Sequence, residues 1–218
     1  GLIALLARFA DLYDLVGRAG NYAGLRFSVD TADPSVAALM QRVEERSTAV
    51  STRLLWFDLE WAALDAARVD ELLADERLDF ARHHLRSLRR YRPHLLSEPE
   101  EVILTEKSVT GASAWSRLFD EQTSAIEVTL DGDAVSLEVA LARLGDPDAS
   151  PRRAAAEAVS AALAPGLRTR AFIYNTLLAD KSTADRLRHY PSWVSARNLS
   201  NEASDESVAA LVTAVSNR

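Results

Sequence analysis

Apolar side chains recur at steps of three and four residues along most of this 218-residue chain. Near its start, Ile3, Leu6 and Phe9 follow this spacing, and Ala10 and Tyr13 continue it. An α-helix turns once in about 3.6 residues, so side chains with this spacing lie on one face of a helix. The chain is therefore predicted to be mostly α, a multi-helix array or bundle.

Capping residues mark where several of these helices begin. Asp33 suits an N-cap and Pro34 suits the first helical position, and the long helix after them is predicted to reach about Ala66. Further helices are predicted at Val69–Leu73, Glu76–Tyr91, Ser97 to about Lys107, Trp115–Gln122, Ser136 to near Gly145, Arg152 to about Leu163, Arg168–Leu178 and from Ser204 onward.

One stretch of the chain follows a different period. Apolar residues alternate at positions 126, 128 and 130, and again at 135 and 137, on either side of Asp131-Gly132. This pattern is a strong signal for a hairpin, because Asp-Gly suits the tight turn between two strands. We predict one small β-hairpin near residues 125–136. Two strands are not stable alone in water, so we expect the hairpin to lie on helices or beside another strand.

Composition excludes several classes of function. The formal net charge is −7, so a general affinity for nucleic acid is not expected. The chain has no Cys, which excludes disulfides and thiolate chemistry and fits a reducing compartment, so we expect a cytoplasmic location. The apolar start is broken by Arg8 and Asp11, far short of the length that spans a membrane, so no membrane partner is expected.

Motifs for metal-dependent hydrolysis are absent from the sequence. A zinc peptidase helix carries HExxH, which places two His on one face with a Glu poised to activate water. The four His, at positions 83, 84, 94 and 189, are neither followed by Glu nor joined by another His four residues later. We therefore assign no catalytic and no metal-binding residue to this chain. A weaker metal pair, Asp79 and His83 with His94 as a third ligand, is better interpreted as solvated side chains.

A run of arginines interrupted by no acidic residue precedes Ser97. Its members are Arg82, Arg86, Arg89, Arg90 and Arg92. One interpretation is a site for an anion, a peptide carboxylate or RNA. The other is a cationic helix end that offsets the helix dipole and pairs with the acidic residues at 98, 100 and 101. The second is favoured because the chain as a whole is acidic.

The segment Arg186–Glu202 reads RLRHYPSWVSARNLSNE, a mixture of aromatic, basic and amide side chains that surface helices do not need. It resembles a hallmark of the oligoendopeptidase F family of zinc metallopeptidases, which are relatives of thimet oligopeptidase. Further segments resemble the family in its own order. They are SVDT at Ser28–Thr31, YRPHLLSEPEE at Tyr91–Glu101, EKSVTGASAW at Glu106–Trp115, RRAAAEA at Arg152–Ala158 and FIYNTLLADK at Phe172–Lys181.

The resemblance covers nearly the whole chain and implies the N-terminal, channel-wall portion of a zinc-dependent oligoendopeptidase that hydrolyses short peptides. The family's HExxH and its other active-site groups would lie beyond Arg218, in a C-terminal peptidase domain that is missing here. Zinc is therefore implied for the full-length parent but not for this chain, which is predicted to be inactive alone. The alternative is a free-standing helical module that binds peptides or proteins without catalysis.

The resemblance also suggests a division of the chain and a site. Residues 1–95 would be an N-terminal helical region, residues 96–180 a domain typical of the oligoendopeptidase F N-terminal region, with the hairpin and an Ala-rich helix, and residues 181–218 the truncated start of the peptidase domain. Six residues would lie at a cleft or domain interface: Arg186, Tyr190, Trp193, Arg197, Asn198 and Asn201. The alternative is a structural role, with Trp193 buried and with Arg197 and Asn198 satisfying helix ends.

Overall fold

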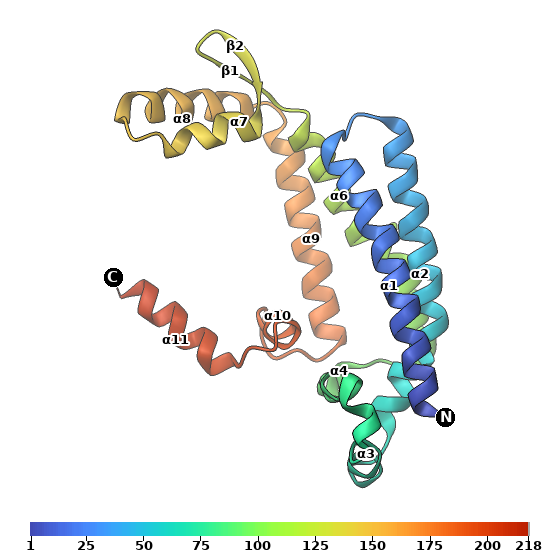
Figure 1. Cartoon of the computed structure of the whole chain (residues 1–218). Coiled ribbons are helices and arrows are strands. Elements are labelled where there is room, and N and C mark those ends of the chain that lie inside the picture. The colour runs from blue at the N-terminus through green and yellow to red at the C-terminus, as the bar shows by residue number, and fades with distance from the viewer. Residues whose placement is uncertain (218) are drawn as a thin grey trace. The chain divides into compact units, whose positions relative to one another are not determined.

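The computed structural model describes residues 1–217, and Figure 1 shows that they form helices almost throughout. The predicted mostly-α fold with one hairpin is confirmed. The described residues divide into two compact units. Unit 1 contains residues 1–17, 47–106 and those from Ala179 onward, and unit 2 contains residues 18–46 and 107–178. None of the described helices is long and apolar enough to cross a membrane.

Two long helices open the chain. Helix α1 spans Leu2–Val29 and α2 spans Pro34–Ala63, so the helix start at Pro34 is confirmed. The carboxylate of Asp33 accepts a hydrogen bond from the Ser35 N–H at 2.7 Å, which satisfies one of the free N–H groups at the start of α2. Glycines at positions 17, 20 and 24 do not interrupt α1.

Short helices follow, and two of them begin at an aspartate that caps the helix start. The short helices are α3 (Ala66–Leu73), the 3-10 turn η1 (Glu76–Leu78), α4 (Asp79–Arg90), the 3-10 turn η2 (Arg92–His94) and α5 (Glu98–Ser108). Asp65 caps α3 by accepting from the Arg68 N–H at 2.9 Å, and Asp75 caps η1 by accepting from the Arg77 N–H at 2.9 Å. The single helix predicted over Glu76–Tyr91 is therefore an η1 turn followed by α4.

The core of unit 1 joins α1, α2, α3 and α4. Its buried members are Leu6, Phe57, Trp61, Val69, Leu73, Leu78, Ala81 and Leu85. The Trp61 ring stacks on Phe57, and its indole N–H donates to the carbonyl of Leu85 at 2.8 Å. A buried indole needs such a partner, because an unsatisfied N–H in the core would be costly.

An arginine from the predicted cationic run closes the end of α2. The Arg89 guanidinium donates to the carbonyls of Trp61 at 3.0 Å and of Leu64 at 2.8 Å. Carbonyls at a helix C-terminus lack partners within the helix. A guanidinium there both donates hydrogen bonds to them and interacts favourably with the negative end of the helix dipole. The pairing expected between the arginines and the acids at 98, 100 and 101 is not found among residues 1–217, since Glu101 pairs with Arg188 and Glu100 bonds to Ser97.

Unit 2 carries the predicted hairpin. Strand β1 (Glu127–Leu130) pairs antiparallel with β2 (Asp133–Ser136), with Val128 opposite Val135. Asp131 and Gly132 both have positive φ, 56° and 94°, as a tight two-residue turn of this kind requires. The hairpin prediction is confirmed in both type and place.

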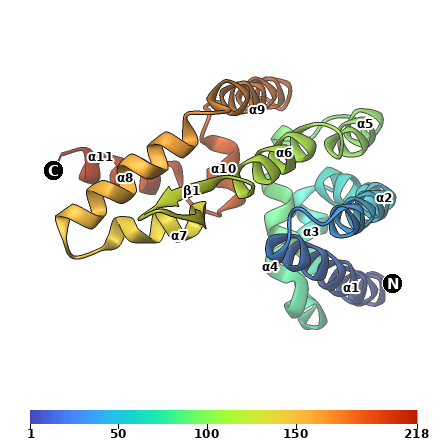
Figure 2. The ribbon, with the colours of Figure 1, turned by 90° about the horizontal axis from the view of Figure 1, so that it is seen from above.

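Helices cover one face of the hairpin, as expected for two strands. The chain continues through α7 (Leu137–Ala142), the 3-10 turn η3 (Arg143–Gly145) and α8 (Ala149–Leu163), and Figure 2 shows α7 and α8 beside β1. Val128 is fully buried with Ala140 and Val159 in a second core. Unit 2 also contains α6 (Ala112–Ser124), where Trp115 meets Phe172 edge to face.

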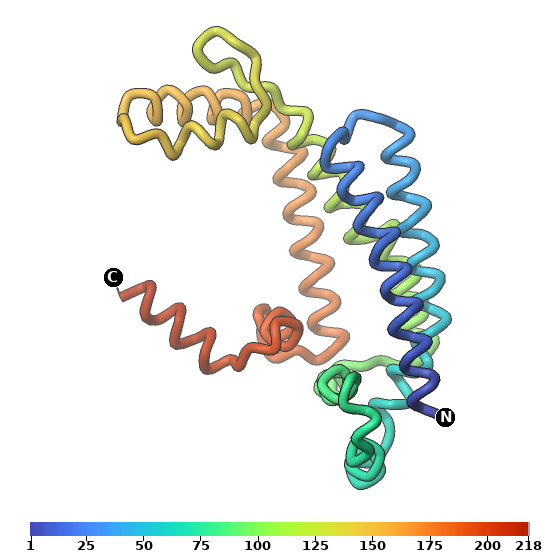
Figure 3. The backbone as a smooth tube through the Cα atoms, viewed as in Figure 1, coloured from blue at the N-terminus to red at the C-terminus, as the bar shows by residue number. Residues whose placement is uncertain are grey.

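Three helices end the described chain. Their bounds are Leu167–Leu187 for α9, Ser195–Ser200 for α10 and Asp205–Ser216 for α11, and the tube in Figure 3 can be followed from one to the next. His189 adopts a left-handed conformation with φ 58°, and the Tyr190 N–H returns to the carbonyl of Asp185 at 2.9 Å. This pattern ends α9. The domain boundaries expected near residues 95 and 180 stay predictions.

Candidate functional site

The segment Arg186–Glu202 meets the segment Tyr91–Glu101 in unit 1. Four side chains make the contact, and we call them the polar junction: His94, Glu101, Arg188 and Tyr190. Arg188 Nη1 lies 2.6 Å from Glu101 Oε1, and Nη2 lies 2.8 Å from Oε2. Two parallel bonds of this kind fix both the distance and the orientation of the pair. Glu101 is only 5% exposed, and the other three residues are half-buried in unit 1.

Helix ends position the two charges. Glu101 lies in the first turn of α5, where the helix dipole favours a carboxylate, and Arg188 directly follows the C-terminus of α9, where the dipole favours a cation. Glu101 Oε1 also accepts the backbone N–H of Leu96 at 2.9 Å. The loop before α5 is therefore tied to the same carboxylate as α9.

His94 and Tyr190 complete the polar junction. The imidazole Nδ1 of His94 lies 2.8 Å from the carbonyl oxygen of Arg188. A carbonyl can only accept, so Nδ1 carries the proton. The Arg188 guanidinium in turn donates to the carbonyl of His94 at 3.2 Å, and the rings of His94 and Tyr190 stack with centroids 3.9 Å apart. Each segment thus both donates to and accepts from the other.

The electrostatics of the polar junction keep its ion pair charged at neutral pH. Burial by itself would raise the pKa of Glu101, but the bonds from Arg188 and Leu96 and the charge of Arg188 outweigh it, so the pKa lies below its usual range. The bond to Glu101 raises the pKa of Arg188, and burial raises the pKa of Tyr190. The charges of Glu101 and Arg188 are paired and Glu101 is buried. The polar junction therefore holds two segments of unit 1 together.

The six predicted site residues are not brought together at this junction. Tyr190 belongs to it, while Arg186 and Arg197 are exposed. Asn201 is exposed and caps the C-terminus of α10, with its N–H bonded to the carbonyl of Arg197 at 2.9 Å. Trp193 is 78% exposed, so the alternative in which this ring is buried is wrong.

Asn198 belongs to a second group of contacts, at the turn between α10 and α11. It is buried, and its side-chain amide donates to the carboxylate of Asp205 at 2.7 Å. Glu202 has a left-handed φ of 55° and accepts from the Ser87 hydroxyl at 2.8 Å, with His83 Nε2 at 3.0 Å. The turn is therefore held by α4 and by its own helix ends.

Three of the four junction residues were not predicted from the sequence to be site residues. Arg188 lay inside the selected segment but was not singled out, and His94 and Glu101 lay inside YRPHLLSEPEE. The signal that could have found them is the pairing of two unusual segments, one with an acid at a helix start and one with a cation at a helix end. Without a contact to relate them, each residue was consistent with a solvated surface.

No metal-binding group is formed by the residues that the structure describes, 1–217. The weak candidate ligands have separate partners. Asp79 pairs with Arg82 on its own helix, His83 contacts Glu202, and His94 lies in the polar junction. The Asp79, His83 and His94 alternative is therefore not assembled.

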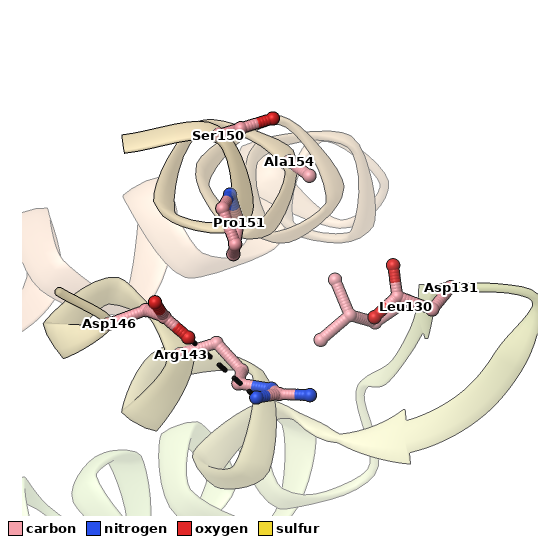
Figure 4. Close-up of a pocket in the computed structure, with 7 residues that line it drawn as sticks. All are labelled: Leu130, Asp131, Arg143, Asp146, Ser150, Pro151 and Ala154. Carbon is pink, nitrogen blue, oxygen red and sulfur yellow. Dashed lines mark ion pairs between the residues drawn. The ribbon is translucent and has the colours of Figure 1, made fainter. Parts of the chain in front are cut away.

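A pocket of about 280 Å³ lies in unit 2, beside the N-terminus of α8 (Figure 4). Its lining residues are Leu130, Asp131, Arg143, Asp146, Ser150, Pro151 and Ala154. Arg143 Nη1 lies 3.8 Å from Asp146 Oδ2, so the cation in this pocket has an internal counter-charge. None of the predicted site residues lines it.

A shallow apolar groove of about 460 Å³ lies in unit 1, between α2 and the loop before α5. Its apolar lining is Trp56, Leu59, Ala62, Ala63, Leu95 and Leu96. Glu60, Arg92 and Glu98 add charge to the lining. An apolar surface bordered by charges of both signs suits a short apolar peptide segment better than a small anion.

Comparison with known proteins gives two kinds of match. A family model described as oligopeptidase F matches residues 60–127. The crystal structure of oligoendopeptidase-F from Enterococcus faecium matches with a TM-score of 0.76 and 25% identity, over 91% of this chain and 39% of that chain. A predicted peptidase from Chlamydophila abortus matches with a TM-score of 0.58 and 18% identity, over 90% of this chain and 34% of that chain, which shows the fold alone. No match was found among curated proteins.

Proposed function

We propose, from the confirmed resemblance of this chain to the N-terminal portion of oligoendopeptidase F, that it is the channel-wall portion of a zinc-dependent oligoendopeptidase that hydrolyses short peptides. The observation that carries the proposal is the agreement of two matches, one to residues 60–127 and one over 91% of the chain. The chain spans 39% of the Enterococcus enzyme, so a peptidase domain outside these residues is part of the proposal.

The zinc ion belongs to that proposed parent and not to this chain. A catalytic zinc needs three protein ligands and an open position for water. No three His, Asp or Glu side chains of residues 1–217 converge in this way, so the residues present do not fit the ion. This chain would contribute the wall of the channel and the placement of the peptidase domain, and it would have no activity alone.

The six members of the predicted site would have two different tasks. We assign Arg186, Trp193 and Arg197, whose side chains are exposed, to the cleft or domain interface. Tyr190, Asn198 and Asn201 would hold the backbone that presents them, through the polar junction and the turns around α10. The absence of Cys fits a cytoplasmic location, which is part of the same proposal.

Peptidase assays on two proteins test this function. The 218-residue chain and the longer polypeptide that contains it would each be incubated with internally quenched peptides, with and without a metal chelator. We expect cleavage by the longer polypeptide only, and loss of cleavage with chelator. Chelator-sensitive cleavage by this chain alone would contradict the assignment of catalysis to another domain, and an inactive longer polypeptide would contradict the peptidase itself.

A free-standing binding module remains the second candidate, because of the apolar groove in unit 1. Such grooves accept an amphipathic helix or an extended peptide. Calorimetric titration of this chain with short peptides would test it. Saturable binding that is lost on replacing Leu59 by Asp, in a chain with no downstream peptidase domain, would favour this candidate over the first.

A further inference from the structure

Helix α11 carries an apolar stripe that is largely exposed in the part of the chain that the structure describes. Its members are Val208, Leu211, Val212 and Val215, which recur at the spacing of one helix face. Leu211, Val212 and Val215 are 65%, 59% and 66% exposed. No residue of α11 is buried, whereas α1, α2, α3 and α4 each place apolar residues in the core of unit 1.

A helix of this length needs a partner. Isolated helices shorter than about 12–15 residues are marginal in water, and helices in proteins gain most of their stability from packing one apolar face. Helix α11 has 12 residues. Its side-chain anchors lie at its start, where the Ser204 hydroxyl accepts the Ser207 N–H at 3.1 Å and Asp205 accepts from Asn198 at 2.7 Å.

Hydrogen bonds hold the start of α11, while most of its apolar stripe is exposed. Glu202, two residues before the N-cap, takes a left-handed φ of 55° that non-glycine residues seldom adopt. Its carboxylate is fixed by Ser87 and His83 of α4, as described above. The turn that leads from α10 into α11, which can be followed in Figures 1 and 3, is therefore attached to α4 within unit 1.

We infer that the apolar stripe of α11 is the docking surface against which the rest of the peptidase domain packs in the longer polypeptide. The inference rests on the proposed function and adds to it which surface meets that domain. The occupant follows from length: this chain matches over 91% of its residues, yet accounts for only 39% of the Enterococcus enzyme. Most of a related polypeptide is therefore outside these residues and available to cover the stripe.

Charge makes a lipid surface a poor occupant. Helices that bind anionic membranes carry Lys and Arg on their polar face. Helix α11 has no basic residue, and Asp205 and Glu206 lie in its first turn. An anionic bilayer would repel this helix, whereas a folded domain with an apolar groove would accept it.

Hydrogen exchange measured by mass spectrometry tests the docking surface. We expect the α11 amides to exchange at least about tenfold more slowly in the longer polypeptide than in the 218-residue chain. The reason is that packing of the apolar stripe suppresses local unfolding of the helix. The double variant L211S/V215S should abolish this protection. The control A210S/T213S, on the opposite face of the same helix, should keep it. Amides of α4 report in each variant that unit 1 is folded.

The outcomes separate this inference from the function on which it rests. Equal α11 exchange in both proteins, or protection that survives L211S/V215S, would overturn the docking surface. Protection that appears in the 218-residue chain and rises with its concentration would also overturn it, in favour of a second copy. A longer polypeptide that protects α11 but cleaves no peptide would keep the docking surface and refute the peptidase, and an active polypeptide with unprotected α11 would do the reverse.

Discussion

Glu101 and Arg188 form a doubly hydrogen-bonded ion pair, although they are 87 residues apart in the sequence. The pair joins the first turn of α5 to the end of α9. Its two residues lie in two of the segments that resemble oligoendopeptidase F. Since the carboxylate is buried, loss of Arg188 would leave it without its counter-charge, which is costly.

Replacing Glu101 by Gln should lower the free energy of unfolding of this chain by about 2 kcal/mol, because one partner of a mostly buried pair is left behind. Denaturant unfolding followed by circular dichroism would measure it. Glu98→Gln, on the same helix but exposed, is the matched control and should change stability by less than about 0.5 kcal/mol. Similar effects from both variants would contradict the polar junction as a stabilising contact.

The same carboxylate predicts a pH dependence. Because the pKa of Glu101 is lowered on folding, its contribution is present above the pKa of an unfolded Glu, about 4.3, and is lost as the pH falls below that value. The difference in stability between the unmodified chain and Glu101→Gln should therefore be largest near neutral pH and shrink toward pH 3. Unfolding curves for both proteins across this range would show it, and a constant difference would refute the assignment.

For Asp58 on α2 we expect the opposite effect, in which removal of the charge raises the free energy of unfolding at neutral pH. Burial raises the pKa of its carboxyl group, and the charge of His84 offsets this only in part. The ionised form is therefore disfavoured in the folded chain, which is a cost fully present above the raised pKa and absent below the pKa of an unfolded Asp, about 3.9. Asp58→Asn should stabilise the chain at pH 7 and lose its advantage in acid. Asp11→Asn, at an exposed position of α1, should be neutral at both pH values.

Among the arginines of the cationic run, we expect Arg89 to contribute more to the free energy of unfolding than Arg86. Its bonds to the last carbonyls of α2 are replaced by no other side chain, so Arg89→Gln should cost about 2 kcal/mol of unfolding free energy. Arg86→Gln, four residues from Arg90 on the exposed face of α4, should cost less than about 0.5 kcal/mol. Equal losses would mean that the run stabilises α4 by its total charge and not by one cap.

Local features of the fold could be predicted from the sequence because local chemistry decides them. Asp131-Gly132 fixes a tight turn, Asp33-Pro34 starts a helix, and Ser204 caps one, wherever the rest of the chain lies. Each prediction needed only residues within about four positions, the reach of a helical turn or a hairpin loop. These three were confirmed.

The polar junction could not be predicted, because it depends on which segments meet. Glu101 was expected to pair with an arginine of the nearby cationic run, since pairs close in sequence are common. The structure pairs it instead with Arg188, and Arg89 turns to the carbonyls of α2. Tertiary packing chose among several arginines of similar character, and the sequence of a single chain does not rank them.

Trp193 separates a role in function from a role in folding. Its side chain is 78% exposed, so Trp193→Ser should change the stability of this chain by less than about 0.5 kcal/mol. Trp61→Ser is the matched control and should cost at least about 3 kcal/mol, because that indole is 3% exposed and bonded to Leu85. In the longer polypeptide, Trp193→Ser should still lower kcat/KM for peptides, since an exposed indole at a cleft or domain interface loses contacts only there. Unchanged kcat/KM would remove Trp193 from the proposed site without affecting the fold, and a large loss of stability in this chain would return it to a structural role.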